Sequence, residues 1–318
     1  MKKLGIIVMA GILSIAGFAQ QDAQFSINMF NHLTYNPGYA GYSDQICTHA
    51  VARKQWAGFD NAPSTMLFNV NAPIPGNNGV GLNVIKDKIG FEDNLMLNGI
   101  FSHLFPVGKG NLGVGISLGF INRSLSADWI SYSSLTGEGA GQNVYSDEII
   151  PHDGSKLGFD MGFGIYYNAT NYYAGISSTH INRSQLKYEE NINPFNQRHV
   201  FLTGGYYFDL SDGVSQIMPS VFVESDGAST QYLISGTYIY ARKYWAGLAY
   251  RTTDAVILMM GIDFQQGYGI GYAYDFSTSQ MSKHTSGSHE IIFRYCFSME
   301  NNKGQTKYTG PRNLGIRR

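Results

Sequence analysis

Large apolar residues alternate with small ones along much of the chain. In residues 112–120 every second side chain, from Leu112 to Phe120, is aliphatic or aromatic, and the residues between them are Gly or Ser. Residues 157–167 and 268–276 repeat this pattern, with Gly, Ala or Asp at the intervening positions. Successive side chains of a strand point to opposite faces, so a period of two predicts β-strands that have one apolar face and one face of small residues.

The same alternation divides most of the chain into fourteen expected strands. They lie near residues 46–56, 64–72, 79–87, 92–105, 110–122, 157–168, 171–180, 198–210, 215–225, 230–241, 243–253, 255–265, 268–277 and 287–298. This count puts the long connections 123–156, 181–197 and 278–286 at one end of the sheet, and short turns such as 168–171 and 210–213 at the other. Outer-membrane barrels have an even number of strands and the same sorting of loops from turns.

The small-residue face distinguishes a barrel from a soluble β-sandwich. A sandwich would carry Lys, Glu and Thr on its solvent face, whereas here Gly, Ser and Ala predominate. Charged residues are 14% of the chain, against about 25% in soluble domains. We therefore predict an all-β fold, a transmembrane antiparallel outer-membrane β-barrel of about fourteen strands with its apolar face toward lipid. The net charge of −1 argues against a nucleic-acid partner.

The two ends of the chain differ from the barrel region. Residues 1–19 combine Lys2 and Lys3, an apolar run and small residues up to Ala19, which predicts a cleaved signal peptide. Residues 20–45 lack alternation and are expected in the periplasm or as a plug inside a barrel formed by residues 46–298. Residues 299–318 form a basic tail, and we expect both termini to be periplasmic.

Several short motifs are arranged in an order that resembles one family. Residues 24–26 read Gln-Phe-Ser, residues 36–41 read Asn-Pro-Gly-Tyr-Ala-Gly, and residues 53–63 read Arg-Lys-Gln-Trp-Ala-Gly-Phe-Asp-Asn-Ala-Pro. Later, Gly-Tyr-Ala-Tyr-Asp-Phe at 271–276 precedes Gly-Ser-His-Glu at 287–290. In this combination the chain resembles the PorP/SprF family of type IX secretion outer-membrane proteins. It departs from the family's frequent Pro-Arg-Phe ending, because residues 311–313 read Pro-Arg-Asn.

The resemblance implies a function and a set of partners. Such proteins assist secretion or cell-surface anchoring of large cargo and, in gliding species, of motility adhesins. The implied partners are a cargo protein with a type IX C-terminal sorting domain, the secretion machinery, peptidoglycan-linked periplasmic components and membrane lipids. We expect loops 123–156 and 181–197 to meet cargo, and a further set of residues to form a plug or partner contact: Phe25, Phe30, Tyr35, Pro37, Trp56 and Phe59. The alternative function is an outer-membrane diffusion channel for small solutes.

Eight charged residues fall on the inward phase of their strands: Arg53, Asp160, Glu224, Arg251, Asp263, Asp275, Glu290 and Arg294. A cation on the lipid face at the bilayer midplane costs about 2–4 kcal/mol, which favours the inward placement. These residues carry charges of both signs, so they form no ring that would select one kind of ion. We therefore favour charge pairs that hold the barrel and its inner segments together over an ion conduction path.

The two cysteines lie near the same end of the first and last strands. Closure of the barrel makes those strands neighbours, and the periplasm permits disulfides, so we expect Cys47 and Cys296 to form a disulfide across the seam.

No residue pattern indicates an enzyme, a cofactor or a metal site. Gly115–Gly119 matches Gly-x-Ser-x-Gly, but the motif requires a strand-to-helix turn and lies here in mid-strand. The eight histidines are scattered, without metal-ligand spacing on a shared face. His152 and Asp153 lie in an acidic loop that is more readily explained by solvation than by a divalent cation.

Overall fold

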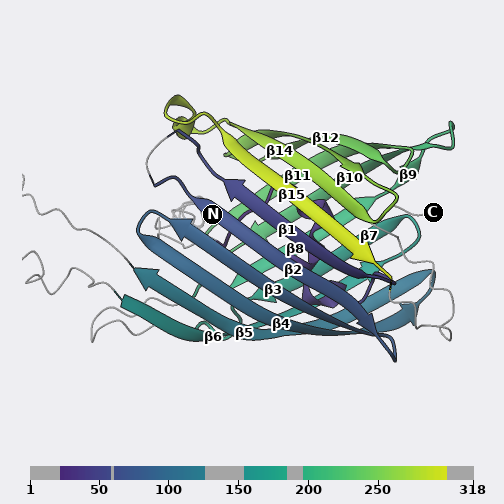
Figure 1. The fold of residues 1–318 in the computed structure, drawn as a ribbon, viewed down its shortest axis with the longest axis horizontal. Coiled ribbons are helices and arrows are strands. Elements are labelled where there is room, and N and C mark those ends of the chain that lie inside the picture. The colour runs from purple at the N-terminus through teal and green to yellow at the C-terminus, as the bar shows by residue number, and fades with distance from the viewer. Residues whose placement is uncertain (1–21, 59–60, 126–153, 185–195, 299–318) are drawn as a thin grey trace, which may run out of the picture.

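The structure, a computed structural model, describes residues 22–58, 61–125, 154–184 and 196–298. They form a closed antiparallel β-barrel of fourteen strands, one of which is interrupted (Figure 1). The strands are β1 Ile46–Lys54, β2 Ser64–Ile74, β3 Asn78–Ile89, β4 Glu92–Val107, β5 Gly110–Leu125, β6 Gly154–Asn168, β7 Tyr172–Thr179, β8 His199–Tyr206, β9 Phe208–Asp209, β10 Ser215–Ser225, β11 Thr230–Tyr240, β12 Tyr244–Arg251, β13 Ala255–Asp263, β14 Tyr268–Ser277 and β15 Ser288–Phe297. The predicted fold class is confirmed.

Closure joins the first strand to the last. β1 pairs with β15 from Ile46 opposite Phe297 to Lys54 opposite His289, and the two strands lie side by side across the front of Figure 1. β8 and β9 both pair with β10 and together make one strand of the barrel. They are separated at Tyr207, whose side chain is buried. The expected strand 198–210 therefore contains a break that alternation did not indicate.

The two faces of the sheet follow the predicted alternation. On β5, Ile116, Leu118 and Phe120 are exposed, and Gly115 and Ser117 face the interior. Exposed side chains of this kind recur around the barrel, which gives it the apolar outer surface of a membrane barrel.

The strands next to the longest connection extend beyond their predicted limits. β5 continues to Leu125 and β6 begins at Gly154, and these two residues are opposite each other in the register. β1, by contrast, ends at Lys54 rather than at residue 56. We call the end of the barrel with connections 126–153, 180–198 and 278–287 the loop end, and the opposite end the turn end.

Residues 22–45, which we call the plug segment, lie inside the barrel and contain three short 3₁₀ helices: η1 Asn28–Phe30, η2 His32–Thr34 and η3 Pro37–Tyr39. Asp22 contacts Thr179 and His180 at the loop end, and Tyr42 contacts Asn111 and Tyr166 at the turn end. The plug segment therefore runs the length of the lumen.

This path places residue 22 at the opposite end of the barrel from the two ends of the sheet. β1 begins at the turn end and β15 ends there, as the even number of strands predicts. Asp22, by contrast, lies at the loop end. The expectation that both termini are periplasmic stays a prediction. The predicted signal peptide 1–19, the tail 299–318 and the loop residues His152 and Asp153 lie outside the described residues. Among the described residues, no helix is long and apolar enough to cross a membrane.

Candidate functional site

The lumen and its plug segment bring together most of the residues that the sequence singles out. Inward side chains fill the interior of a barrel of about eight strands, whereas barrels of 16–18 strands enclose an aqueous channel. A barrel of fourteen strands therefore has a lumen that its own inward side chains do not fill. Here the filling comes from the plug segment, in which Ile27, Met29 and Leu33 are each 1% exposed. These three apolar residues are packed in the lumen and do not face lipid.

A network of four charged residues holds the start of the plug segment to the barrel wall. Arg53 donates hydrogen bonds to Ser26 Oγ at 2.8 Å and to Asp275 Oδ2 at 2.8 Å. Arg251 donates to the same two residues, at 2.9 Å in each case. The backbone N–H groups of Ser26 and Ile27 donate to the two oxygens of Glu290, at 2.7 and 2.9 Å. All four charged side chains are at least 97% buried, so the network is a paired lumen cluster.

The other four predicted lumen charges are also turned inward. Arg294 forms an ion pair with Asp263 and stacks over the ring of Phe30, with its guanidinium 5.6 Å from the ring centroid. Asp160 and Glu224 lie near histidines at the loop end and are 2% and 6% exposed. The structure thus places opposite charges in contact around the lumen and shows no ring of one sign among the described residues.

The predicted plug residues lie in two places. Phe25, Phe30, Tyr35 and Pro37 are buried in the lumen, where Phe30 packs edge-on against Trp245 with ring centroids 4.7 Å apart. Trp56 lies in the β1–β2 connection at the loop end, in the left-handed region with φ 49°, and its backbone N–H donates to Ser288 Oγ at 3.0 Å. Phe59 lies outside the described residues.

The Asn-Pro-Gly turn at residues 36–38 binds the inner wall directly. The Asn36 side chain donates to the carbonyl oxygens of Ile165 at 3.0 Å and Ile176 at 3.3 Å, and accepts from the N–H of Gly38. A Cβ at Gly38 would lie 2.8 Å from the Gly113 carbonyl oxygen. The wall is lined by glycine here, and glycine on both sides allows this close approach of two backbones.

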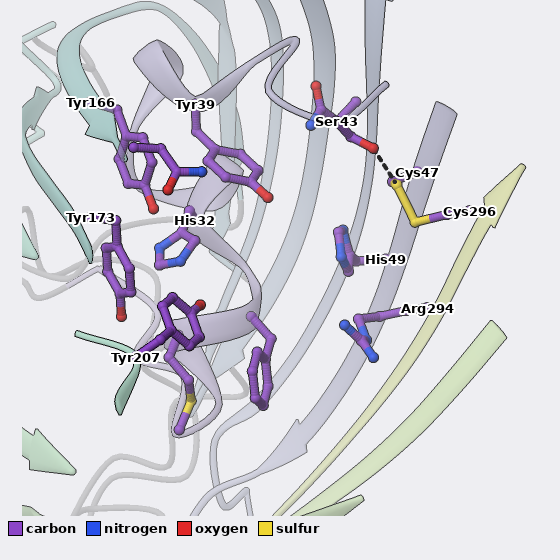
Figure 2. Close-up of a pocket in the computed structure, with 14 residues that line it drawn as sticks. His32, Tyr39, Ser43, Cys47, His49, Tyr166, Tyr173, Tyr207, Arg294 and Cys296 are labelled. Carbon is purple, nitrogen blue, oxygen red and sulfur yellow. Dashed lines mark hydrogen bonds between the residues drawn. A yellow bond between two sulfur atoms is a disulfide. The ribbon is translucent and has the colours of Figure 1, made fainter. Parts of the chain in front are cut away.

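Cys47 and Cys296 are opposite each other in the β1–β15 register and form a disulfide, with Cα atoms 4.1 Å apart. The bond closes the seam near the turn end, beside a cavity of about 30 Å³ between the plug segment and the wall. Figure 2 shows this cavity, with His32 facing Tyr166, Tyr173 and Tyr207 on one side and the disulfide and Arg294 on the other. About 30 Å³ is room for a water molecule, not for a solute path.

A second group of polar residues lies at the loop end, where the plug segment begins. Asp22 Oδ1 is 2.9 Å from His180 Nε2, and His180 Nδ1 is 2.6 Å from Asp160. Burial disfavours a protonated imidazole, but the carboxylates of Asp22 and Asp160 outweigh it and raise the pKa of His180 to about 10. Burial alone would raise the pKa of Asp22, yet His180 and His199 hold it well below its usual range.

No sequence pattern indicates this histidine pair. His180 and His199 are separated by a loop, and neither their spacing nor a shared strand face links them. Only the pairing of β7 with β8, in which Thr179 is opposite His199, brings both to one end of the barrel. Sequence spacing therefore could not link these two histidines, whose donor atoms lie within 4.8 Å of each other and of Asp22.

Ser117 lies within β5 on the inner wall, and β5 is followed by no helix in the described residues. The Gly-x-Ser-x-Gly match therefore lacks the turn that nucleophile chemistry requires.

Comparisons with known proteins agree with this geometry. Residues 17–295 match the model of a family described as "Type IX secretion system membrane protein PorP/SprF". No curated protein matches the chain. The fold is similar to that of the CymD monoaromatic hydrocarbon channel, with TM-score 0.51, 14% identity, and 88% of this chain and 95% of that chain covered. A TodX monoaromatic hydrocarbon channel variant gives TM-score 0.52 and 11% identity, with 90% and 97% covered. At these identities the two channels show the shared barrel fold alone.

Proposed function

The chain belongs to the PorP/SprF family of type IX secretion system membrane proteins, and from that premise we propose that it is a plugged barrel that acts by binding proteins. In this function it assists secretion or surface anchoring of a cargo with a type IX C-terminal sorting domain, or of an adhesin in a gliding cell. The observation that best supports a binding function is that the plug segment fills the lumen.

A diffusion channel needs a continuous water-filled path, and the plug segment occupies that position. It is fixed at both ends, by Arg53 and Arg251 near the loop end and by Tyr42 near the turn end, where the Tyr42 hydroxyl donates to the Tyr166 carbonyl at 2.7 Å. The two proteins of similar fold are monoaromatic hydrocarbon channels, whereas the lumen of this barrel contains packed side chains. We therefore favour the binding function over the diffusion channel.

The two ends of the barrel offer different surfaces to partners. We propose that the loop end faces the cell exterior and meets cargo through loops 123–156 and 181–197, most of whose residues lie outside the described part of the chain. The turn end would then face the periplasm, where peptidoglycan-linked components and the basic tail are available. The sorting of long loops from short turns supports this orientation.

Affinity purification in mild detergent from native outer membranes, followed by mass spectrometry, tests the proposal. We expect recovery of a type IX machinery component, or of a large surface protein that ends in a sorting domain. A variant with residues 185–195 replaced by a Gly-Ser linker should lose cargo and keep the machinery component. The matched control replaces residues 75–77 at the turn end and should keep cargo. Recovery of the barrel alone from all three would contradict the binding function.

A further inference from the structure

The loop-end histidine cluster has the composition of a metal site. Asp22, His180 and His199 offer one carboxylate oxygen and two imidazole nitrogens, all within 4.8 Å of one another. They come from the plug segment, the end of β7 and the start of β8. Ligands 2.0–2.2 Å from a tetrahedral ion lie about 3.3–3.6 Å apart. Asp22 Oδ1 and His180 Nε2 are 2.9 Å apart, so a small separation of the two side chains would admit an ion.

Each histidine is oriented by a contact at Nδ1, and its Nε2 faces Asp22. His199 Nδ1 donates to the Gln197 carbonyl at 3.0 Å, so its unprotonated nitrogen is Nε2, which accepts from the Asp22 N–H at 3.3 Å. His180 Nδ1 donates to Asp160 at 2.6 Å. Ligating histidines almost always donate the other ring nitrogen to a carboxylate or a backbone carbonyl, and both arrangements occur here.

An additional buried carboxylate lies at the cluster without a hydrogen-bond donor. Glu224 of β10 is 6% exposed, and its Oε1 has no hydrogen-bond partner among the described residues. This oxygen is 3.9 Å from His199 Nε2. A buried carboxylate oxygen without a donor is costly, and a cation bound by His199 and Glu224 together would remove that cost.

An ion pair explains part of the cluster but not all of it. His180 bridges Asp22 and Asp160, yet this contact leaves Glu224 Oε1 without a hydrogen-bond donor among the described residues. Beside the cluster a cavity of about 40 Å³, lined in part by Asp87 and Arg123, has room for a water molecule that completes a coordination shell.

We propose that Asp22, His180, His199 and Glu224 bind one divalent first-row transition-metal ion, with Zn²⁺ as the ion that suits two imidazoles and two carboxylates. Asp160 is a positioning residue that fixes the ring of His180. Because Asp22 belongs to the plug segment and the other three ligands belong to the wall, the ion ties the start of the plug to β7, β8 and β10.

The experiment uses the full chain, purified from outer membranes without a polyhistidine tag and stripped with EDTA in detergent. Zn²⁺ titration by calorimetry, with the metal content checked by mass spectrometry, should give about one ion per chain. The His180→Ala/His199→Ala variant should weaken Zn²⁺ binding by more than about tenfold, and Asp160→Asn by about 10–100-fold. The control His103→Ala alters a histidine bonded to Asn78 at the turn end and should leave the affinity unchanged.

Two further measurements keep the proposal testable if the double variant does not fold. Asp22→Asn and Glu224→Gln preserve side-chain size and should each weaken Zn²⁺ binding. Co²⁺ in place of Zn²⁺ should give ligand-field absorption bands that disappear in His199→Ala. Equal Zn²⁺ binding by the wild type and all ligand variants, or no binding by the folded wild type, would overturn the proposal and leave the cluster as an ion pair only.

Discussion

The backbone N–H of Ser26 donates a 2.7 Å hydrogen bond to the Glu290 carboxylate, 264 residues later in the chain. Ser26 lies in the plug segment and Glu290 on the last strand, so this bond connects the beginning of the lumen filling to the end of the barrel wall. The guanidinium of Arg53 lies beside both residues and binds Ser26 Oγ and Glu290 Oε2. Closure of the barrel and placement of the plug are therefore coupled through one buried site.

Removal of one cation from this network should destabilise the protein strongly. In Arg251→Met, Asp275 keeps a buried charge with only Arg53 as a cationic partner, and breaking a buried pair in this way costs about 3–5 kcal/mol. We expect the urea midpoint of the purified barrel to fall accordingly. Arg242→Met changes an exposed arginine in the β11–β12 turn and should leave the midpoint almost unchanged. Similar midpoints for the two variants would show that the network contributes little.

The glycine in the Asn-Pro-Gly turn should tolerate no side chain. Gly38→Val places a Cβ 2.8 Å from the Gly113 carbonyl oxygen and 2.9 Å from that of Gly164, so the plug must shift away from the wall. Overpacking of this kind costs about 1–3 kcal/mol. Limited proteolysis should then cut the plug segment faster than in the wild type.

The matched control for this glycine is Gly236→Val on β11, where an added Cβ meets nothing within 4 Å. It should digest like the wild type. If Gly38→Val also digests like the wild type, the close contact between the turn and the wall is not required to hold the plug.

The seam disulfide should be present in the mature protein and should stabilise it. Denatured, unreduced chain should contain no free thiol, and reduction should release two. Replacing both cysteines in Cys47→Ser/Cys296→Ser should lower the free energy of unfolding by about 2–4 kcal/mol while the barrel still forms, because the strand pairing of β1 with β15 remains. Two free thiols before reduction would show that the bond does not form in the cell.

The sequence predicted the barrel well because each strand contains its own signal. Alternation such as that of Leu118 and Phe120 with Ser117 and Gly119 depends only on neighbouring residues. It predicted the number of strands, the side chains that face lipid, and the end of the barrel at which each connection lies. The break at Tyr207 was missed because Tyr fits either face of a strand. The ends of β5 and β6 were missed because the alternation weakens near the loop.

The interior was predictable only in part. Inward charges such as Arg53 and Glu290 followed from strand phase, but their common partner Ser26 lies in a segment without periodicity. The path of the plug from Asp22 to Tyr42 depends on contacts with strands far away in sequence. The pairing of His180 with His199 likewise depends on tertiary placement, because the loop between them hides their proximity.

The most direct test of a barrel that works through partners is its conductance in planar lipid bilayers. The wild-type chain should insert without steady ion conductance, because the plug segment fills the lumen. The Gly38→Val variant, in which we expect the plug segment to be displaced, should conduct ions. Its conductance would show that barrels prepared in this way insert into the bilayer. A stable open-channel conductance from most wild-type insertions would contradict the plugged barrel and favour a diffusion channel.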